Sequence, residues 1–142
     1  MRFLCFLAPL ILSLTTLCAE HVVWSGEVSS NGNPTALVKL TPKKKYQIKA
    51  SGEINLGKWW QLGKPLADDA CYEYNELVEP RHVNTLKNSL QISLCDGTYH
   101  ADHIYISKPF IADQGGIHFW VQDIDYNDNK GSLKVELIEL PE

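Results

Sequence analysis

Short runs of alternating apolar and polar residues recur along this chain, and no stretch of a dozen residues shows the 3.6-residue periodicity of an amphipathic helix. A two-residue period places successive side chains on opposite faces of a strand. Turn sequences such as Asn31–Pro34 and Asp96-Gly97 separate the runs. The pattern predicts an all-β fold, an antiparallel β-sandwich of jelly-roll or immunoglobulin-like type with about seven or eight strands. Strands are expected at Val22–Trp24, Ala36–Leu40, Tyr46–Ala50, Ser89–Leu94, His103–Ile106, Ile117–Val121 and Leu133–Leu137.

One long segment, between Gly52 and Ser89, lacks this alternation and is rich in aromatic residues. Long loops in compact domains tend to be functional or to be pinned to the rest of the fold. Residues 83–87 are compatible with a short helix. We therefore expect a single long loop that either carries function or is tethered to the rest of the sandwich.

The first 19 residues have the pattern of a secretory signal peptide. Phe3–Leu14 is apolar, and Ala19 stands at the −1 position of a cleavage site. The apolar stretch is too short to span a bilayer, so no transmembrane segment is expected. Cys18 is compatible with a lipoprotein, although the residue before it is too bulky for a good lipobox. The sequence predicts a signal peptide over residues 1–19 and a secreted or periplasmic domain over residues 20–142.

Two of the four cysteines, Cys71 and Cys95, remain after the predicted leader is removed. An even pair in an oxidising compartment favours a disulfide. A metal site is less favoured, because the two cysteines have no CxxC spacing and no adjacent pair of histidines. The disulfide would tether the long loop to the strand expected at Ser89–Leu94.

The densest group of potential metal ligands lies in residues 122–132, between the last two expected strands. Three carboxylates and two amides fall within seven residues there. Oxygen ligands at this density suit Ca²⁺. The alternative is an Asn- and Asp-rich hairpin loop without an ion, because both residues tolerate left-handed backbone. An EF-hand is excluded, because Gly131 stands one position late and the flanking segments read as strands.

The same loop resembles the calcium loop and last strand of bacterial galactophilic lectins of the LecA type. Asp123, Tyr126 and the run Asp128-Asn129-Lys130-Gly131-Ser132 carry the similarity. Weaker similarity covers most of the mature chain, at Trp24–Val28, Ala50–Gly57, Ser89–Leu94 and Gly116-Ile117. The resemblance implies a galactose-binding-like sandwich that binds carbohydrate through Ca²⁺, and homo-oligomerisation as in many such lectins.

Carried over position by position, the resemblance implies five Ca²⁺ ligands. They are the side chains of Asp123, Asp128 and Asn129 and the backbone oxygens of Leu56 and Tyr126. Two carboxylates offset the charge of the ion, and the open coordination positions would take sugar hydroxyls beside Asp123 and Asp128. The chain departs from the family where Gln122 replaces Asn and Lys130 replaces Ser, and it lacks the His and Gln that hold galactose in the family.

Two adjacent tryptophans, Trp59 and Trp60, follow the segment that contains Leu56. Adjacent strand residues point to opposite faces, so one ring can stack on the apolar face of a pyranose while the other enters the core. The alternative packs both rings under the long loop. Trp24 and Trp120 are expected in the core, and the five scattered histidines are expected at the surface.

A net charge of −4 argues against a nucleic-acid partner, since such binding depends on clustered Lys and Arg. No nucleophile and base stand at a spacing that supports catalysis, so the chain is not expected to be an enzyme. The sequence favours a secreted, calcium-dependent carbohydrate-binding domain. The alternative is a secreted protein-interaction or inhibitor module on a β-sandwich without a metal.

Overall fold

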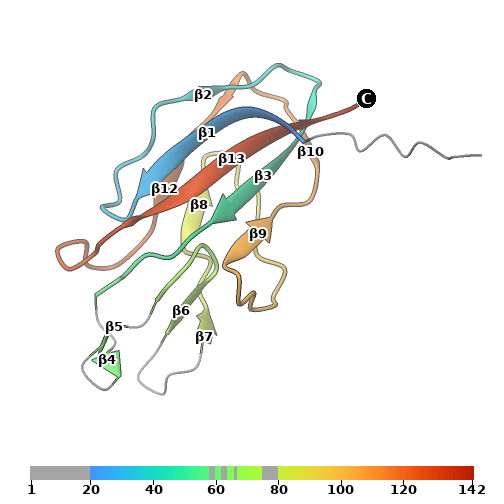
Figure 1. Ribbon diagram of the computed structural model, residues 1–142. Coiled ribbons are helices and arrows are strands. Elements are labelled where there is room, and N and C mark those ends of the chain that lie inside the picture. Colours follow the sequence, from blue (N-terminus) through green and yellow to red (C-terminus); the bar gives the residue numbers. More distant parts are fainter. Residues whose placement is uncertain (1–19, 58–59, 62–63, 66, 75–79) are drawn as a thin grey trace, which may run out of the picture.

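The computed structural model describes residues 20–57, 60–61, 64–65, 67–74 and 80–142 (Figure 1). The predicted signal peptide lies outside these residues. The described residues form thirteen strands and no helix, so none of their elements is a long apolar helix able to cross a membrane. The strands are β1 (His21–Ser29), β2 (Val38–Lys39), β3 (Lys45–Ser51), β4 (Trp60–Gln61), β5 (Lys64–Pro65), β6 (Tyr72–Tyr74), β7 (Pro80–His82), β8 (Leu86–Asn88), β9 (Ile104–Ile106), β10 (Phe110–Ile111), β11 (Gly116–Ile117), β12 (Phe119–Val121) and β13 (Ser132–Leu140).

The first layer is a five-stranded antiparallel sheet in the order β1-β13-β3-β10, with β9 also paired to β3. β1 and β13 lie side by side along its length in Figure 1. Alternation along β13 sends Leu133, Val135 and Leu137 inward, where all three are fully buried. Ile48 and Ala50 of β3 stand opposite Leu137 and Val135 and are also fully buried. One face of this sheet is therefore a continuous apolar surface.

Short strand pairs, β8–β12 and β2–β11, form the second layer. Phe119 and Val121 of β12 and Ile117 of β11 are fully buried. Trp24 of β1 stacks on Phe119 with ring centroids 5.7 Å apart and planes at 12°, which joins the two layers. The core thus lies between two antiparallel layers, and the predicted β-sandwich is confirmed.

The strand predicted at Ile117–Val121 is divided between two partners. β11 pairs with β2, whereas β12 pairs with β8. Between them, His118 donates its N–H to the Ser89 hydroxyl at 3.2 Å and accepts the Ser89 N–H at 3.0 Å. Divisions of this kind give more and shorter strands than the seven or eight expected.

The strand predicted at Ser89–Leu94 is wrong, because Asn88 folds this segment into a turn. The Asn88 amide donates to the carbonyl of Ile92 at 2.7 Å. Its oxygen accepts the N–H groups of Leu90 at 3.2 Å and Ile92 at 3.0 Å. Backbone groups bonded to a side chain cannot pair with a neighbouring strand.

The short helix with which residues 83–87 are compatible is absent as well. Residues 86–88 instead form β8, whose Leu86 and Asn88 point inward while Lys87 is half-buried. Pairing with β12 explains the outcome, since Leu86 stands opposite the buried Val121 and Asn88 opposite the buried Phe119. Alternation over three residues is too short to be recognised in the sequence.

The predicted disulfide between Cys71 and Cys95 is present, with Cα atoms 5.5 Å apart. Cys71 lies in the turn before β6 and is fully buried. Cys95 follows the turn built on Asn88, so the long loop is tethered to an irregular segment and not to a strand. A sequence separation of 24 residues corresponds to about 3.5 kcal/mol of stabilisation in the chain-entropy account of cross-links.

Candidate metal centre

Residues 122–131 connect β12 to β13 and hold four of the five predicted calcium ligands. The N–H of Asn129 approaches the Tyr126 carbonyl at 3.4 Å, which closes a turn over residues 126–129. The Tyr126 hydroxyl accepts the N–H of Asp123 at 3.0 Å. The Tyr126 ring lies against Gly32, where a Cβ would meet ring carbons at 2.6 Å. Tyr126 therefore ties the start of the loop to its final turn.

The fifth predicted ligand, Leu56, is brought to the loop by backbone pairing. Asn55 and Lys130 form a bridge, with N–H to carbonyl distances of 2.9 and 2.8 Å. Asp68 holds the other side of the segment, since its carboxylate accepts the Leu56 N–H at 2.8 Å and its backbone pairs with Ile54. Residues 54–57 are thus fixed directly beside Asn129 and Lys130.

Gly57 allows the Asp128 carboxylate to lie against the backbone. Its φ is +86°, and a Cβ built there would stand 2.1 Å from the carboxylate carbon of Asp128. A side chain of any size would displace this carboxylate. The close approach therefore depends on glycine at position 57.

Three oxygens of the predicted side-chain ligands are buried and have no hydrogen-bond partner among the described residues: Asp123 Oδ2, Asp128 Oδ1 and Asn129 Oδ1. The other end of two of these groups is fixed. Asn129 donates its amide to the carbonyl of Ser30 at 2.9 Å, and Asp123 Oδ1 accepts the N–H of Ile124 at 2.7 Å. The only further oxygen of this kind in the described part of the chain is Thr85 Oγ1.

Unpaired buried oxygens are costly, at about 1–3 kcal/mol for each group and more for a charged one. Their concentration in one loop therefore requires an explanation. A hard cation would satisfy them, since Ca²⁺ takes carboxylate, amide and backbone oxygens together. The described residues contain no group of three or more His, Cys, Asp and Glu side chains placed to hold a metal. An ion here would accordingly depend on amide and backbone oxygens beside two carboxylates, as the predicted ligand set does.

Replacing Gly57 by alanine is expected to lower the affinity for Ca²⁺ by about 10–100-fold, because the new methyl group pushes Asp128 away from its position. Isothermal titration calorimetry measures this. Gly97 provides a matched control, since its φ is +84° and a Cβ there meets nothing within 4 Å. Gly97→Ala carries the same backbone strain and should leave the affinity unchanged. Equal affinities in the two variants would contradict the placement of Asp128.

The two tryptophans predicted to contact sugar lie in the long loop, shortly after Gly57. Trp59 lies outside the described residues. Trp60 begins β4 and is paired with Pro65 of β5. The hairpin β4–β5 lies at one end of the molecule in Figure 1. A carbohydrate-binding role for Trp59 and Trp60 remains a prediction.

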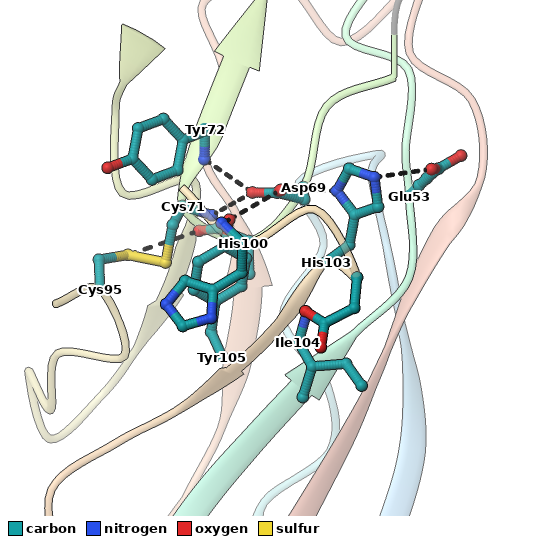
Figure 2. Close-up of polar contacts among 11 residues, drawn as sticks. Glu53, Asp69, Cys71, Tyr72, Cys95, His100, His103, Ile104 and Tyr105 are labelled. Atoms are coloured by element: carbon teal, nitrogen blue, oxygen red, sulfur yellow. Dashed lines mark hydrogen bonds and ion pairs between the residues drawn. A yellow bond between two sulfur atoms is a disulfide. The ribbon is translucent and has the colours of Figure 1, made fainter. Parts of the chain in front are cut away.

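A second polar cluster, formed by Asp69, His103 and Tyr105, was not found by sequence reasoning (Figure 2). His103 Nδ1 lies 2.8 Å from Asp69, and Nε2 lies 2.8 Å from Glu53. Both contacts are hydrogen bonds only when both ring nitrogens carry a proton. The His103 side chain is 13% exposed, so the expectation that all five histidines lie at the surface is wrong for this one.

Asp69 is the centre of this cluster and is 1% exposed. One carboxylate oxygen accepts the N–H groups of Cys71 at 2.9 Å and Tyr72 at 2.8 Å. The other accepts the Tyr105 hydroxyl at 3.0 Å as well as the His103 contact. Burial raises the pKa of Tyr105 well above its ordinary value, so this hydroxyl keeps its proton and donates it.

These contacts give the cluster a structural function. Figure 2 shows the Asp69 carboxylate beside the turn that carries the disulfide. Asp69 and His103 are 34 residues apart, and neither belongs to a motif that marks the pair. Only the Asp-x-Cys spacing gave a local signal, because an aspartate often accepts the N–H two residues later.

No protein-family model matches this sequence, and no curated protein does. Among solved structures, the chain is similar to one described as "EclA N-terminal domain; PllA-like lectin", with a TM-score of 0.53 and 20% sequence identity. The match covers 84% of this chain and 98% of that chain. At this identity the likeness establishes the fold. The chain therefore has the β-sandwich fold of that lectin domain.

Proposed function

We propose that this chain is a secreted, calcium-dependent carbohydrate-binding domain, in which an ion held by residues 123–129 coordinates sugar hydroxyls. The observation that carries the proposal is the set of three unpaired buried oxygens, on Asp123, Asp128 and Asn129. They are the same three side chains that the resemblance to galactophilic lectins implies as ligands. Two independent lines of argument thus meet at one loop.

Each residue of the proposed site would contribute a different property to ion binding. Asp123 and Asp128 supply two negative charges against the divalent ion, and Asn129 adds a neutral oxygen whose orientation is set by Ser30. In this proposal Leu56 and Tyr126 supply the backbone oxygens. The bound ion would supply positive charge that attracts sugar hydroxyls in its open coordination positions. A Ca²⁺ ion commonly takes six to eight oxygens, which leaves room for about one to three hydroxyls beside five protein ligands.

The loop is accessible from solvent. Ile124 is 92% exposed, and Tyr126 is 38% exposed at the turn. A glycan can therefore reach the loop without rearrangement of the core. The exposed apolar side chain of Ile124 in this loop also offers contact to the apolar face of a sugar ring.

A binding domain is favoured over an enzyme. The two adjacent carboxylates of the long loop would be the natural candidates for glycoside hydrolysis. Asp68 instead holds the N–H of Leu56, and Asp69 holds Cys71 and Tyr72. Both carboxylates thus serve to position backbone.

Thermal melts with Ca²⁺ and with chelator test the proposal. A ligand that binds only the folded state at 100 times its Kd stabilises it by about 2.7 kcal/mol. We expect Ca²⁺ to raise Tm accordingly, and EDTA to reverse the shift. Mg²⁺ is the matched control, because it demands an octahedral site and should shift Tm less. An unchanged Tm in millimolar Ca²⁺ would contradict the calcium site.

Glycan binding is then measured in both conditions. The proposal expects glycans to bind in Ca²⁺ and to be released by EDTA. Glycan binding that persists in EDTA would mean that the sugar binds at other residues, such as Trp59 and Trp60. Calcium binding with no glycan binding would keep the calcium site and contradict the carbohydrate-binding function.

A further inference from the structure

A hollow of about 280 Å³ lies on the second layer, formed by the pair β8–β12 and residues 89–93. Its volume is close to the lower end of small-molecule sites, about 300–1,000 Å³. None of its lining residues belongs to the loop at 122–131. Any ligand here would bind independently of the proposed calcium site.

Trp120 forms one wall of the hollow. Its neighbours Phe119 and Val121 are fully buried, so alternation along β12 directs Trp120 away from the core. The expectation that Trp120 is a core residue is therefore wrong, since the ring is half-buried on the outer face. His118 meets the ring edge-to-face, with centroids 6.1 Å apart and planes at 73°, and fixes its orientation. A fixed tryptophan ring on the surface is a suitable platform for the apolar face of a pyranose.

The turn built on Asn88, which also lines the hollow, is held in shape before any ligand arrives. Asn88 is 4% exposed, and both its side-chain amide and its side-chain oxygen form hydrogen bonds with the backbone of residues 90–92. Gln91 adopts a left-handed φ of 58°, and Asn84, which also lines the hollow, has a φ of 52°. Non-glycine residues in this region carry strain, which tends to be kept where a site requires it. The Gln91 side chain is exposed, and no hydrogen bond to it is formed by the described residues.

Lys87 gives the hollow its charge. It stands opposite Trp120 in the register of β8 and β12. Among the described residues that line the hollow, Lys87 has the one charged side chain; the other polar groups are amides and hydroxyls. Lys87 forms no ion pair with any residue in the described part of the chain. An unpaired cation beside an aromatic ring favours an anionic ligand with an apolar face.

We propose that this hollow, between Trp120, Lys87 and Gln91, is a second carbohydrate site that binds a pyranose carrying a carboxylate. The ring would stack on Trp120, the carboxylate would pair with Lys87, and hydroxyls would meet Gln91 and Asn84. The class of ligand rests on the proposed carbohydrate-binding function. The position of the site does not, because it needs no metal.

Titrations in EDTA test this proposal separately from the calcium site. The probes are methyl β-glucuronide and the methyl glycoside of N-acetylneuraminic acid, with methyl β-glucoside as the neutral comparison. We expect both acidic sugars to bind more tightly than the glucoside and to shift the NMR signal of the Trp120 indole N–H. Lys87→Gln should weaken binding of the acidic sugars about tenfold and leave the glucoside unaffected.

Lys39→Gln is the matched control, since Lys39 is an exposed lysine on another short strand of the second layer. It should bind the acidic sugars as the unaltered protein does. Trp120→Ala should abolish binding of all three probes, and Lys87→Gln keeps the test decisive if that variant fails to fold.

Equal binding of acidic and neutral sugars, or equal effects of Lys87→Gln and Lys39→Gln, would overturn the proposal. Absence of binding in EDTA would overturn it as well, and would leave calcium-dependent glycan binding to stand or fall on its own titration.

Discussion

Replacing Asp69 by alanine is expected to lower the free energy of unfolding by about 3–5 kcal/mol, the cost of removing one partner from a buried ionic network. The change leaves the N–H groups of Cys71 and Tyr72 without their acceptor. It also leaves the Tyr105 hydroxyl and the His103 ring facing an apolar gap. Urea unfolding, followed by tryptophan fluorescence, measures the loss as a shift in the midpoint.

The other end of the same histidine supplies the control. Glu53 also contacts His103, but its side chain is 56% exposed. Exposed ion pairs contribute little, so Glu53→Gln should cost less than about 1 kcal/mol. A cost for Asp69→Ala as small as that for Glu53→Gln would mean that the cluster does not stabilise the fold.

The cluster also connects the disulfide to the candidate metal centre. Asp69 fixes the turn at Cys71, while Asp68 beside it fixes the N–H of Leu56. The backbone bridge from Asn55 to Lys130 continues this chain of contacts into the acidic loop. The long loop, which lacks alternation, is thus folded back to build one side of the site. A cross-link and the buried carboxylate of Asp69 hold it there.

The long strands could be predicted because their side chains obey one rule throughout. Along β3, Tyr46, Ile48 and Ala50 are buried, and the residues between them are not. The segment from Ser89 to Leu94 shows the same alternation but turns, because Asn88 captures its backbone groups. Alternation reports which side chains could share a face; it does not report whether the backbone groups are free to pair. Because a strand was predicted at this segment, the hollow beside Trp120 could not be predicted from the sequence.

The candidate site was predictable in part. Density of oxygen side chains and the resemblance to galactophilic lectins identified the acidic loop. Whether the side-chain oxygens of Asp123, Asp128 and Asn129 have hydrogen-bond partners depends on the positions of all their neighbours. Only the structure therefore shows that these oxygens are unpaired. The same holds for Asp69 and His103, which meet only because β9 pairs with β3 and brings residues near Ile104 close to Ser51.

Replacing Asp128 by asparagine is expected to weaken Ca²⁺ binding by about 100–1,000-fold, which equals about 3–4 kcal/mol. The substitution nearly keeps the shape of the side chain but removes one of the two charges that face the ion. In EDTA the same substitution should be neutral or slightly stabilising, because it relieves the repulsion between Asp123 and Asp128. The effect on stability thus has opposite signs with and without Ca²⁺, and calorimetric titration beside thermal melts measures both.

Asp125→Asn is the matched control for this prediction. Asp125 lies in the same loop and carries the same charge, but its oxygen accepts the backbone and side-chain N–H groups of Asn127 at 3.1 and 2.9 Å. An asparagine oxygen can accept both, so the loop should keep its shape. A screened charge outside the ligand set should change the Ca²⁺ affinity by no more than about threefold. If Asp125→Asn and Asp128→Asn weaken Ca²⁺ equally, the loop attracts the ion by its overall charge, and no defined site at Asp128 exists.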